Sequence, residues 1–427
     1  MRNKITLLFV MLLIALPLLF ACGEPEQTKL PEGAVESDGL IYAPTNEGTA
    51  YEIIGVSSEK EEYTPVSAVN GLPVVAVGNS AFYNNKTLKK ITLPEGVVKI
   101  GLYAFDNCKN LEYILIPDSV KEIKFNAFSD CEKLREVRLP ASLETIGTNA
   151  FSRCYSLENL YVNSSLAAVE KDAFFSCTAL DGVYIDSMAS WCKIEFENVE
   201  ANPLYYAENL YVGGTLSNNL KIEGVETVGH HTFFGFKGLE TLVLGEGVIT
   251  IDNSAFSNCV NLKTVVLSDT VENIGKSAFN TCSSLEYITV GRGVKRFEGL
   301  AFYACTSLYA VEILDLAVWC DAFFYTDNSG SANPMRYADT VIIDGEETLD
   351  LYIPDDVKVI STLAFIGFKG RSVSLPESLK TIEKTAFYWC KNLTTIYYRG
   401  NSGGFQRLSV GQNNFEMVTK ENIFYEK

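Results

Sequence analysis

The chain has 427 residues, of which 47% are hydrophobic and 21% are charged, a balance that indicates a folded protein and excludes a disordered one. Its formal net charge is −18, and no long run of Lys or Arg interrupts the acidic balance. Phosphate backbones would be repelled, so nucleic acid is not an expected partner.

Residues 1–21 have the pattern of an export signal. A short cationic start, Arg2 and Lys4, precedes an apolar run that reaches Phe20. This run is shorter than the roughly 20 residues that a membrane-spanning helix needs. No later apolar run is long enough to cross a bilayer either. The sequence therefore predicts a signal peptide and no transmembrane anchor.

A cysteine directly follows this apolar run. The tetrapeptide Leu19-Phe20-Ala21-Cys22 resembles the bacterial lipobox, in which the cysteine becomes the lipidated first residue of the mature protein. The alternative is an ordinary cleaved signal with an incidental cysteine. We expect lipidation at Cys22 and attachment to the membrane through this lipid only. The next segment, 22–39, begins with polar residues and a proline and is expected to be a flexible tether.

The dipeptide Ala-Phe recurs through the body of the chain. The step is 23 residues within each of two long blocks and 22 residues at the last copy, and one copy has Thr in place of Ala. The flanking residues follow the template L-x-x-I-x-L-P-x-x-V-x-x-I-G-x-x-A-F-x-x-C. Such a period indicates a repeat architecture. The repeated phenylalanines are Phe82, Phe105, Phe128, Phe151, Phe174, Phe233, Phe256, Phe279, Phe302, Phe365 and Phe387.

The unit at residues 88–108 shows how the template should fold. Residues 91–93 alternate between inward and outward positions as in a strand, and Pro94, which has no N–H group to donate, ends the strand. The spacing from Ile100 to Phe105 suits one face of a helical or 3-10 turn. Each repeat is therefore predicted to be one coil, with a short strand and a helical return.

One coil buries too few apolar side chains to offset the conformational entropy of its own backbone. Stacking completes the burial and adds hydrogen bonds between strands, so stability belongs to the array. We predict an α/β repeat solenoid over 40–400, with one long parallel sheet whose strands lie about 4.8 Å apart. Residues 40–75 are expected to form the opening coil and N-terminal cap, and residues 401–427, which lack the template, a C-terminal cap.

Two stretches break the period, at about 186–222 and 314–352. Each contains a Trp-Cys pair, an Asn-Pro pair and a candidate strand, so the two stretches resemble each other. We interpret each as one irregular coil within the stack and not as a separate domain. The matching features are Trp191-Cys192 and Trp319-Cys320, Asn202-Pro203-Leu204 and Asn333-Pro334-Met335, and the candidate strands 210–212 and 340–343.

The repeat from about 66 to 400 resembles the bacterial leucine-rich repeats of the BspA type, also called the Treponema pallidum type. The AF-x-x-C phrase and its 23-residue step carry this resemblance. It implies a right-handed leucine-rich-repeat superhelix on a bacterial cell surface, outside the cytoplasm. Members of the family are associated with adhesion to proteins of the host or of neighbouring cells.

Eight of the eleven cysteines lie three residues after a repeat phenylalanine. They are expected to stack as a column of buried, reduced thiols. Neighbouring coils are close enough for disulfides, but stacked Cβ vectors run parallel and suit the disulfide dihedral angle poorly. No C-x-x-C pair of a zinc or redox site is present. The eight are Cys108, Cys131, Cys154, Cys177, Cys259, Cys282, Cys305 and Cys390.

No catalytic motif stands out in the sequence. The two histidines, His230 and His231, are adjacent, and on an extended segment their rings should point in opposite directions and could not jointly hold a metal. No nucleophile elbow, zinc-protease motif or phosphate-binding loop occurs. We expect a protein that is not an enzyme and that carries no catalytic residue, metal site or cofactor.

Outward-facing strand positions on consecutive coils present Tyr113, Leu115, Arg138, Tyr161 and Tyr184. Because Tyr and Arg are enriched at interface hot spots, we expect this strip to bind a protein or a glycan. The alternative is that tyrosine simply suits a strand surface. The expected function is recognition by a monomer, including adhesion to host or neighbouring cells, and the alternative is a passive envelope scaffold or spacer without a dedicated ligand.

Overall fold

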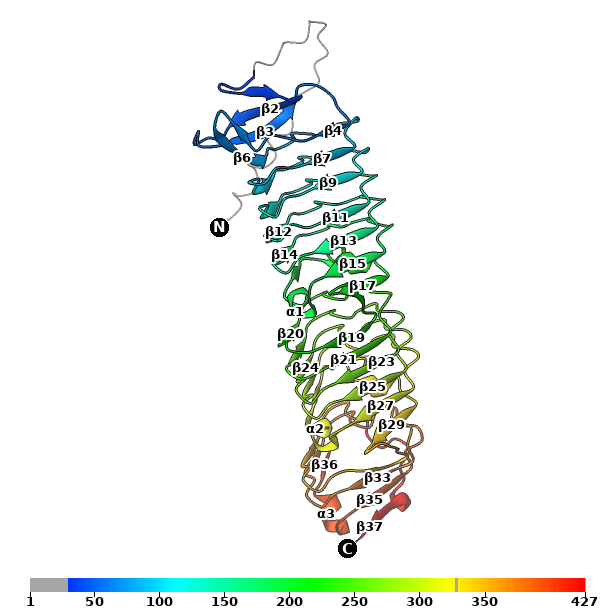
Figure 1. Cartoon of the computed structure of the whole chain (residues 1–427). Coiled ribbons are helices and arrows are strands. Elements are labelled where there is room, and N and C mark those ends of the chain that lie inside the picture. The colour runs from blue at the N-terminus through cyan, green and yellow to red at the C-terminus, as the bar shows by residue number, and fades with distance from the viewer. Residues whose placement is uncertain (1–29, 327–328, 427) are drawn as a thin grey trace, which may run out of the picture.

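The computed structural model describes residues 30–326 and 329–426. Coils stack along one axis into a long, gently curved solenoid, with the first described strands at one end and the last described strands at the other (Figure 1). The predicted signal peptide and Cys22 lie outside the described residues. Among the described residues, no helix has the length and apolar character needed to span a bilayer.

An antiparallel meander covers the first coil. It consists of β1 (Val35–Ser37), β2 (Leu40–Pro44) and β3 (Tyr51–Val56), and β3 then pairs in parallel with β6 (Leu72–Val77). A further hairpin joins β5 (Ala68–Val69) to β6. The strand β1 belongs to the segment predicted to be a tether, which therefore ends before residue 35.

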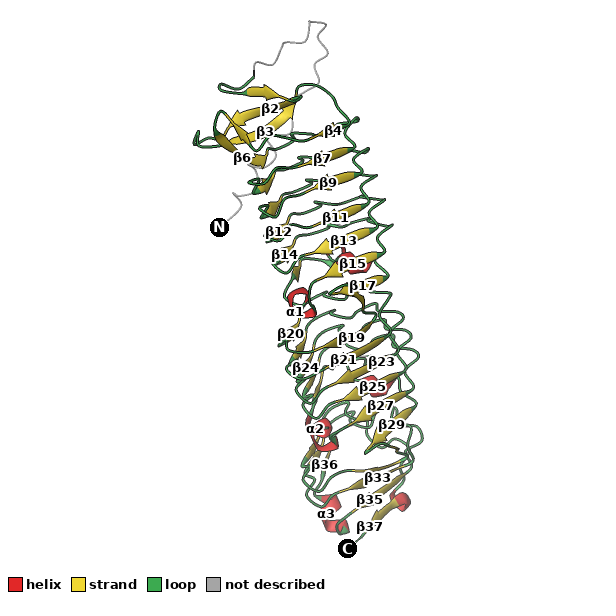
Figure 2. Ribbon diagram, viewed as in Figure 1, coloured by secondary structure: helices red, strands yellow, loops and turns green. Residues whose placement is uncertain are grey.

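Most coils contribute one strand to a long row on one face of the solenoid (Figure 2). Within each of the four sheets that make up this row, successive strands pair in parallel with a register shift of one repeat, as in Ile91 opposite Ile114. The predicted parallel repeat solenoid is thus confirmed. The row consists of β4 (Glu62–Tyr63), β7 (Lys90–Thr92), β9 (Tyr113–Leu115), β11 (Glu136–Arg138), β13 (Asn159–Val162), β15 (Gly182–Ile185), β17 (Asn209–Val212), β19 (Asn219–Ile222), β21 (Thr241–Leu244), β23 (Thr264–Leu267), β25 (Tyr287–Val290), β27 (Ala310–Ile313), β29 (Thr340–Ile343), β31 (Asp350–Tyr352), β33 (Ser372–Leu375), β35 (Thr395–Tyr398) and β37 (Ile423–Tyr425).

A second row of two-residue strands runs along the return side, where the sequence predicted helical turns. Its strands also pair in parallel with a shift of one repeat, and the second residue of each, such as Ile100 or Ile123, is buried in all but the last strand, β36. The row consists of β8 (Lys99–Ile100), β10 (Glu122–Ile123), β12 (Thr145–Ile146), β14 (Ala168–Val169), β16 (Glu195–Phe196), β20 (Thr227–Val228), β22 (Thr250–Ile251), β24 (Asn273–Ile274), β26 (Arg296–Phe297), β28 (Phe323–Phe324), β32 (Val359–Ile360), β34 (Thr381–Ile382) and β36 (Ser409–Val410).

The segment around each repeat phenylalanine is also not a helix. Ser80 and Asn84, two residues before and after Phe82, have left-handed φ values of 57° and 59°. These two residues interrupt any continuous helix, and the N–H group of Phe82 donates to the carbonyl of Ala104 in the next coil at 2.7 Å. The same pair of left-handed positions recurs around the other repeat phenylalanines. The backbone hydrogen bonds of the return therefore run between coils, which explains why the predicted helical returns are replaced by turns.

The repeat phenylalanines form the centre of the core. Phe105 and Phe128 are fully buried, and their rings stack with centroids 5.1 Å apart at an interplanar angle of 3°. The cysteine column runs beside them. The Cys131 Sγ donates to the carbonyl of Phe105 in the preceding coil, and this arrangement is repeated for all eight repeat cysteines. All ten described cysteines are buried and free, among them the eight repeat cysteines that were predicted to be so.

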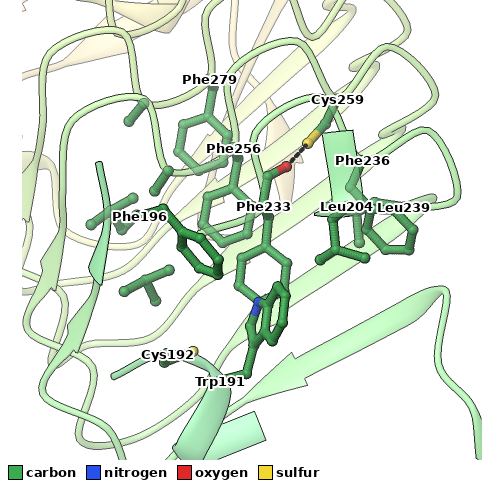
Figure 3. Close-up of a cluster of buried hydrophobic side chains, with 14 of the residues drawn as sticks. Trp191, Cys192, Phe196, Leu204, Phe233, Phe236, Leu239, Phe256, Cys259 and Phe279 are labelled. Carbon is green, nitrogen blue, oxygen red and sulfur yellow. Dashed lines mark hydrogen bonds between the residues drawn. The ribbon is translucent and has the colours of Figure 1, made fainter. Parts of the chain in front are cut away.

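The first irregular stretch forms a coil that contains α1 (Met188–Trp191) and the 3-10 turns η1 (Val199–Ala201) and η2 (Pro203–Tyr205). Its Trp191 lies at the end of the row of rings that begins with Phe233, and the Trp191 indole N–H donates to the Thr232 carbonyl at 3.1 Å (Figure 3). The hairpin from β17 to β18 (Thr215–Leu216) then ends the sheet.

The second irregular stretch repeats this design with α2 (Leu316–Asp321), η3 (Pro334–Arg336) and a hairpin from β29 to β30 (Glu346–Glu347). The Trp319 indole N–H donates to the Ala364 carbonyl at 2.8 Å, as Trp191 does to Thr232. The long row is divided into separate sheets at these two hairpins and also between β9 and β11, where the sequence predicted one continuous sheet.

The tail predicted to be a C-terminal cap adds one more coil. It contains α3 (Ser402–Gln406), β36, η4 (Lys420–Asn422) and β37, and both strands continue their rows. Phe415 stacks on Phe387 at 4.9 Å and extends the ring column, although the spacing of these two residues departs from the repeat.

Candidate binding site

Side chains at alternate positions of the long row face outward and form two columns. The register places Arg138, Tyr161, Tyr184 and Tyr211 opposite one another on β11, β13, β15 and β17. We call these four residues the tyrosine column. They line up because the residues before them, Leu160 for example, point into the core, so the next residue on each strand must face solvent.

The members of the tyrosine column are in direct contact. The Arg138 guanidinium lies over the Tyr161 ring at 3.7 Å. The Tyr161 and Tyr184 rings stack at 4.3 Å, and the Tyr184 and Tyr211 rings stack at 4.4 Å with only 6° between their planes. Stacking fixes the side-chain rotamers in advance, so a ligand would lose less conformational entropy on binding.

A groove of about 460 Å³ runs beside the tyrosine column. Two carboxylates, Asp118 and Asp186, and the hairpin turn at Gly213 and Gly214 contribute to its lining. Both glycines have left-handed φ values, 55° and 83°, as a tight hairpin turn requires. The first irregular coil therefore supplies both the last ring of the column and part of the groove.

The polar groups of the tyrosine column interact with one another and with a neighbouring carboxylate. Burial against its neighbours raises the pKa of Tyr184 above its ordinary value, and the hydroxyls of Tyr161 and Tyr211 add to the effect. Arg138 pairs with the Glu136 carboxylate at 2.8 Å across an exposed surface. The column thus offers aromatic faces, hydroxyl donors and one cation, a combination suited to binding and not to acid–base catalysis.

Comparison with known proteins identifies the repeat. The profile described as "BspA type Leucine rich repeat region" matches residues 74–200, 209–329 and 346–423, in six copies. These segments cover more than half of the chain. The chain belongs to the BspA-type leucine-rich repeat family.

The chain is similar to several solved structures. A leucine-rich repeat protein from Bacteroides ovatus is 21% identical, with a TM-score of 0.57 over 92% of this chain and 100% of that chain. A leucine-rich cell surface protein from Faecalibacterium prausnitzii is 21% identical, with a TM-score of 0.39 over 89% and 98%. The leucine-rich repeat protein of Treponema pallidum is 24% identical, with a TM-score of 0.37 over 59% and 90%. A comparison with curated proteins finds no match.

The strand register places the five residues of the predicted strip in two different columns. Arg138, Tyr161 and Tyr184 lie in the tyrosine column, and Leu115 occupies the equivalent outward position on β9. Tyr113 belongs to the other column, because it is opposite Lys90, whose ammonium lies 5.7 Å from its ring centroid.

Sequence reasoning missed Tyr211, the last ring of the column. This residue lies in the irregular coil, outside the 23-residue period that was used to list outward positions. A local signal was present, because Asn209-Leu210-Tyr211-Val212 repeats the tetrapeptide Asn159-Leu160-Tyr161-Val162 letter for letter. Identical tetrapeptides indicate equivalent strands even where the spacing between coils changes.

The cysteines of the BspA-type repeat do not form a reactive site. Burial raises the pKa of Cys108 and of Cys177 to about 12, so both thiols stay protonated at neutral pH. Because the thiolate is the nucleophile and the metal ligand, these residues act as core side chains. Within residues 30–326 and 329–426, no group of three or more His, Cys, Asp or Glu side chains could hold a metal ion.

The two histidines lie side by side, contrary to the prediction that they point in opposite directions. Their ring centroids are 3.7 Å apart because His231 has a left-handed φ of 59°, so the segment is not extended. His230 Nδ1 lies 2.6 Å from the Asn253 carbonyl oxygen, whereas the buried Nδ1 of His231 has no hydrogen-bond partner. Burial first, and then the neighbouring His230, lower the pKa of His231 to about 4.

Proposed function

We propose that this protein is a lipid-anchored recognition protein of the bacterial cell surface, and that the tyrosine column binds its ligand. The support comes from the pre-stacked rings of Tyr161, Tyr184 and Tyr211 beside a groove of about 460 Å³. A passive spacer would need neither feature. The lipobox-like tetrapeptide ending at Cys22 supports export and anchoring, and the family supports protein binding as the general role.

We propose that the tyrosine column mediates adhesion to host or neighbouring cells. The four side chains of the tyrosine column follow one another over about 14 Å, at a strand spacing of about 4.8 Å, and such a linear array suits an extended partner better than a small molecule. Aromatic side chains bury large areas at little entropic cost, because they have only two side-chain torsions to fix. The partner is therefore expected to be a protein or a glycan chain laid along the column.

The test measures binding of the purified chain to immobilised fibronectin, laminin and collagen, each before and after enzymatic removal of its glycans. Substitution of Tyr161, Tyr184 and Tyr211 by Ala should weaken binding at least tenfold, since each buried aromatic anchor contributes more than about 1.4 kcal/mol at a hot spot. Loss of binding after deglycosylation would indicate a glycan, and retained binding a protein.

Two variants serve as controls. Tyr113→Ala removes a tyrosine of the neighbouring column that is more exposed than the rings of the tyrosine column, and it should leave binding unchanged. Cys22→Ala should abolish adhesion of whole cells while the soluble chain keeps its affinity. If the triple variant adheres like the wild type, or if no matrix or cell-surface protein is bound at all, the passive scaffold becomes the better explanation.

A further inference from the structure

Three cations gather at one groove of an otherwise acidic chain. Arg336, Lys369 and Lys391 contribute to the lining of a groove of about 350 Å³ together with Trp389, Gly367 and Asn392. The groove lies near the C-terminal end of the solenoid, where η3 of the second irregular coil meets the following coils. None of the three cations forms an ion pair with another residue of the described part of the chain.

Arg336 is held firmly, and no carboxylate among residues 30–326 and 329–426 pairs with it. Its guanidinium lies over the Trp389 ring at 4.2 Å and within 5.6 Å of the Tyr337 ring centroid. The Nε atom is buried and has no hydrogen-bond partner. Buried polar atoms in native proteins are nearly always hydrogen-bonded, so an orphaned atom on a positioned cation needs an explanation. A stacked guanidinium with free N–H groups is suited to an oxyanion.

Trp389 occupies a position that does not favour tryptophan. It lies two residues after Phe387 and has a left-handed φ of 62°. At the equivalent position other coils carry Asn84, Asn107 and Asn258, which tolerate this conformation far better than a bulky residue does, but also Thr281 and Ala304. The left-handed turn is therefore a feature of the repeat, and the tryptophan is what distinguishes this coil. Here the indole, which also stacks on Tyr388 at 4.7 Å, holds the guanidinium in place.

The coils around the first irregular stretch provide an internal comparison for this groove. The first irregular coil and the coils after it present the same backbone, with Asn261 donating to the Lys237 carbonyl at 2.8 Å just as Asn392 donates to that of Lys369 at 3.0 Å. Three side chains differ at the equivalent positions. The first copy has Tyr205, Asn258 and Val260 where the second has Arg336, Trp389 and Lys391. The cationic groove is therefore an addition to the fold and not a requirement of it.

We infer that this groove binds the carboxylate or sulfate group of an acidic saccharide. The Gly367 N–H, which could otherwise pair with a peptide, already donates to the Tyr388 carbonyl at 2.8 Å. Recognition must then come from the charged and amide side chains, which can contact an anionic group and hydroxyls. A volume of about 350 Å³ lies at the small end of ligand pockets and suits one or two sugar rings. This site is separate from the tyrosine column.

The experiment titrates the full chain with four probes of similar length, namely a heparin-derived hexasaccharide, a hyaluronan hexasaccharide, neutral maltohexaose and hexaglutamate. We expect binding of one or both acidic saccharides, which separates sulfate from carboxylate recognition, and none of the neutral sugar. Arg336→Gln should lower the association constant at least tenfold, and Arg336→Lys should lower it less. Lys391→Val, which introduces the residue found at the equivalent position 260, should reduce the salt dependence of binding.

Trp389→Asn tests the positioning role of the indole. Because Asn suits the left-handed backbone, this variant should unfold at the same temperature as the wild type or a higher one, yet bind at least tenfold more weakly. A matched control is Arg296→Gln, which removes another arginine that lies over an aromatic ring, that of Phe323, at 4.3 Å. The control should bind like the wild type.

A gain of function provides the strictest version of the test. The triple variant Tyr205→Arg, Asn258→Trp, Val260→Lys should create a second saccharide site and raise the stoichiometry from one to two. Equal loss of binding in Arg336→Gln and Arg296→Gln, or stronger binding of hexaglutamate than of either acidic saccharide, would overturn the inference. Substitution of the tyrosine column should leave saccharide binding intact, so the two proposals can fail independently.

Discussion

At the scale of single residues, His231 gives the chain a pH dependence. The pKa of a histidine in an unfolded chain is about 6.5, and burial of His231 first and then His230 lower it to about 4 in the folded protein. The folded state therefore holds the ring neutral, and the unfolded chain takes up the proton more readily. The stability that depends on the neutral ring is complete above pH 6.5 and is lost as the pH falls towards 4.

The check is to compare thermal unfolding of the wild type and His231→Asn between pH 7 and pH 4. Asn occupies the same left-handed position in other coils, at Asn126 and Asn149, so the variant should fold. We expect the wild type to lose more stability than the variant over this interval. If the stability of the two chains changed with pH in the same way, the pH dependence could not be attributed to His231.

At the scale of elements, one asparagine fastens each irregular coil to the next coil. Asn202 is fully buried, and its Nδ2 donates to the carbonyls of His231 and Thr232 at 2.7 and 2.9 Å, while its Oδ1 accepts from the Leu204 N–H at 2.9 Å. Asn333 makes the equivalent three hydrogen bonds. The Asn-Pro pair that the two irregular stretches share is thus a joint in the stack.

Asn202→Ala should lower the free energy of unfolding by about 1–3 kcal/mol, because it leaves the buried Leu204 N–H without a partner. The Thr232 and His231 carbonyls keep their hydrogen bonds from the Trp191 indole and the Phe234 N–H. Urea denaturation measures the change. Asn209→Ala, which removes only an exposed hydrogen bond to Asp181, should cost less than about 0.5 kcal/mol. A change of similar size in both variants would show that Asn202 does not join the coils.

At the scale of the whole molecule, stability depends on contacts between neighbouring coils. The Phe128 ring is stacked between those of Phe105 and Phe151, whereas Phe415 stacks only on Phe387 and is half-buried. Phe128→Ala should therefore destabilise the array by about 3–5 kcal/mol, and Phe415→Ala by clearly less. Amide hydrogen exchange should show protection lost first in the coils beside residue 128. Uniform loss along the chain would mean that the solenoid unfolds as one unit.

Much of this architecture could be predicted from the sequence, because the repeat signals are local. The 23-residue step of the repeat phenylalanines indicated the stack, and the position of Cys131 three residues after Phe128 indicated the thiol column. The outward tyrosines Tyr161 and Tyr184 followed from strand alternation alone. Tyr113 also faces outward, as predicted, but it lies in the neighbouring column, because strand alternation says which side chains face outward and not which of them share a column.

The sequence by itself determined what repeats: the coil, its buried residues and its outward positions, since each depends on spacing within a few residues. Only the tertiary structure decided how neighbouring coils satisfy each other's backbone hydrogen bonds. Left-handed residues beside each phenylalanine direct the backbone hydrogen bonds of the return to the next coil, which produced turns and a second strand row where a helix was expected. The same contacts between coils, formed across irregular spacings, brought Tyr211 into the tyrosine column and Arg336 onto Trp389.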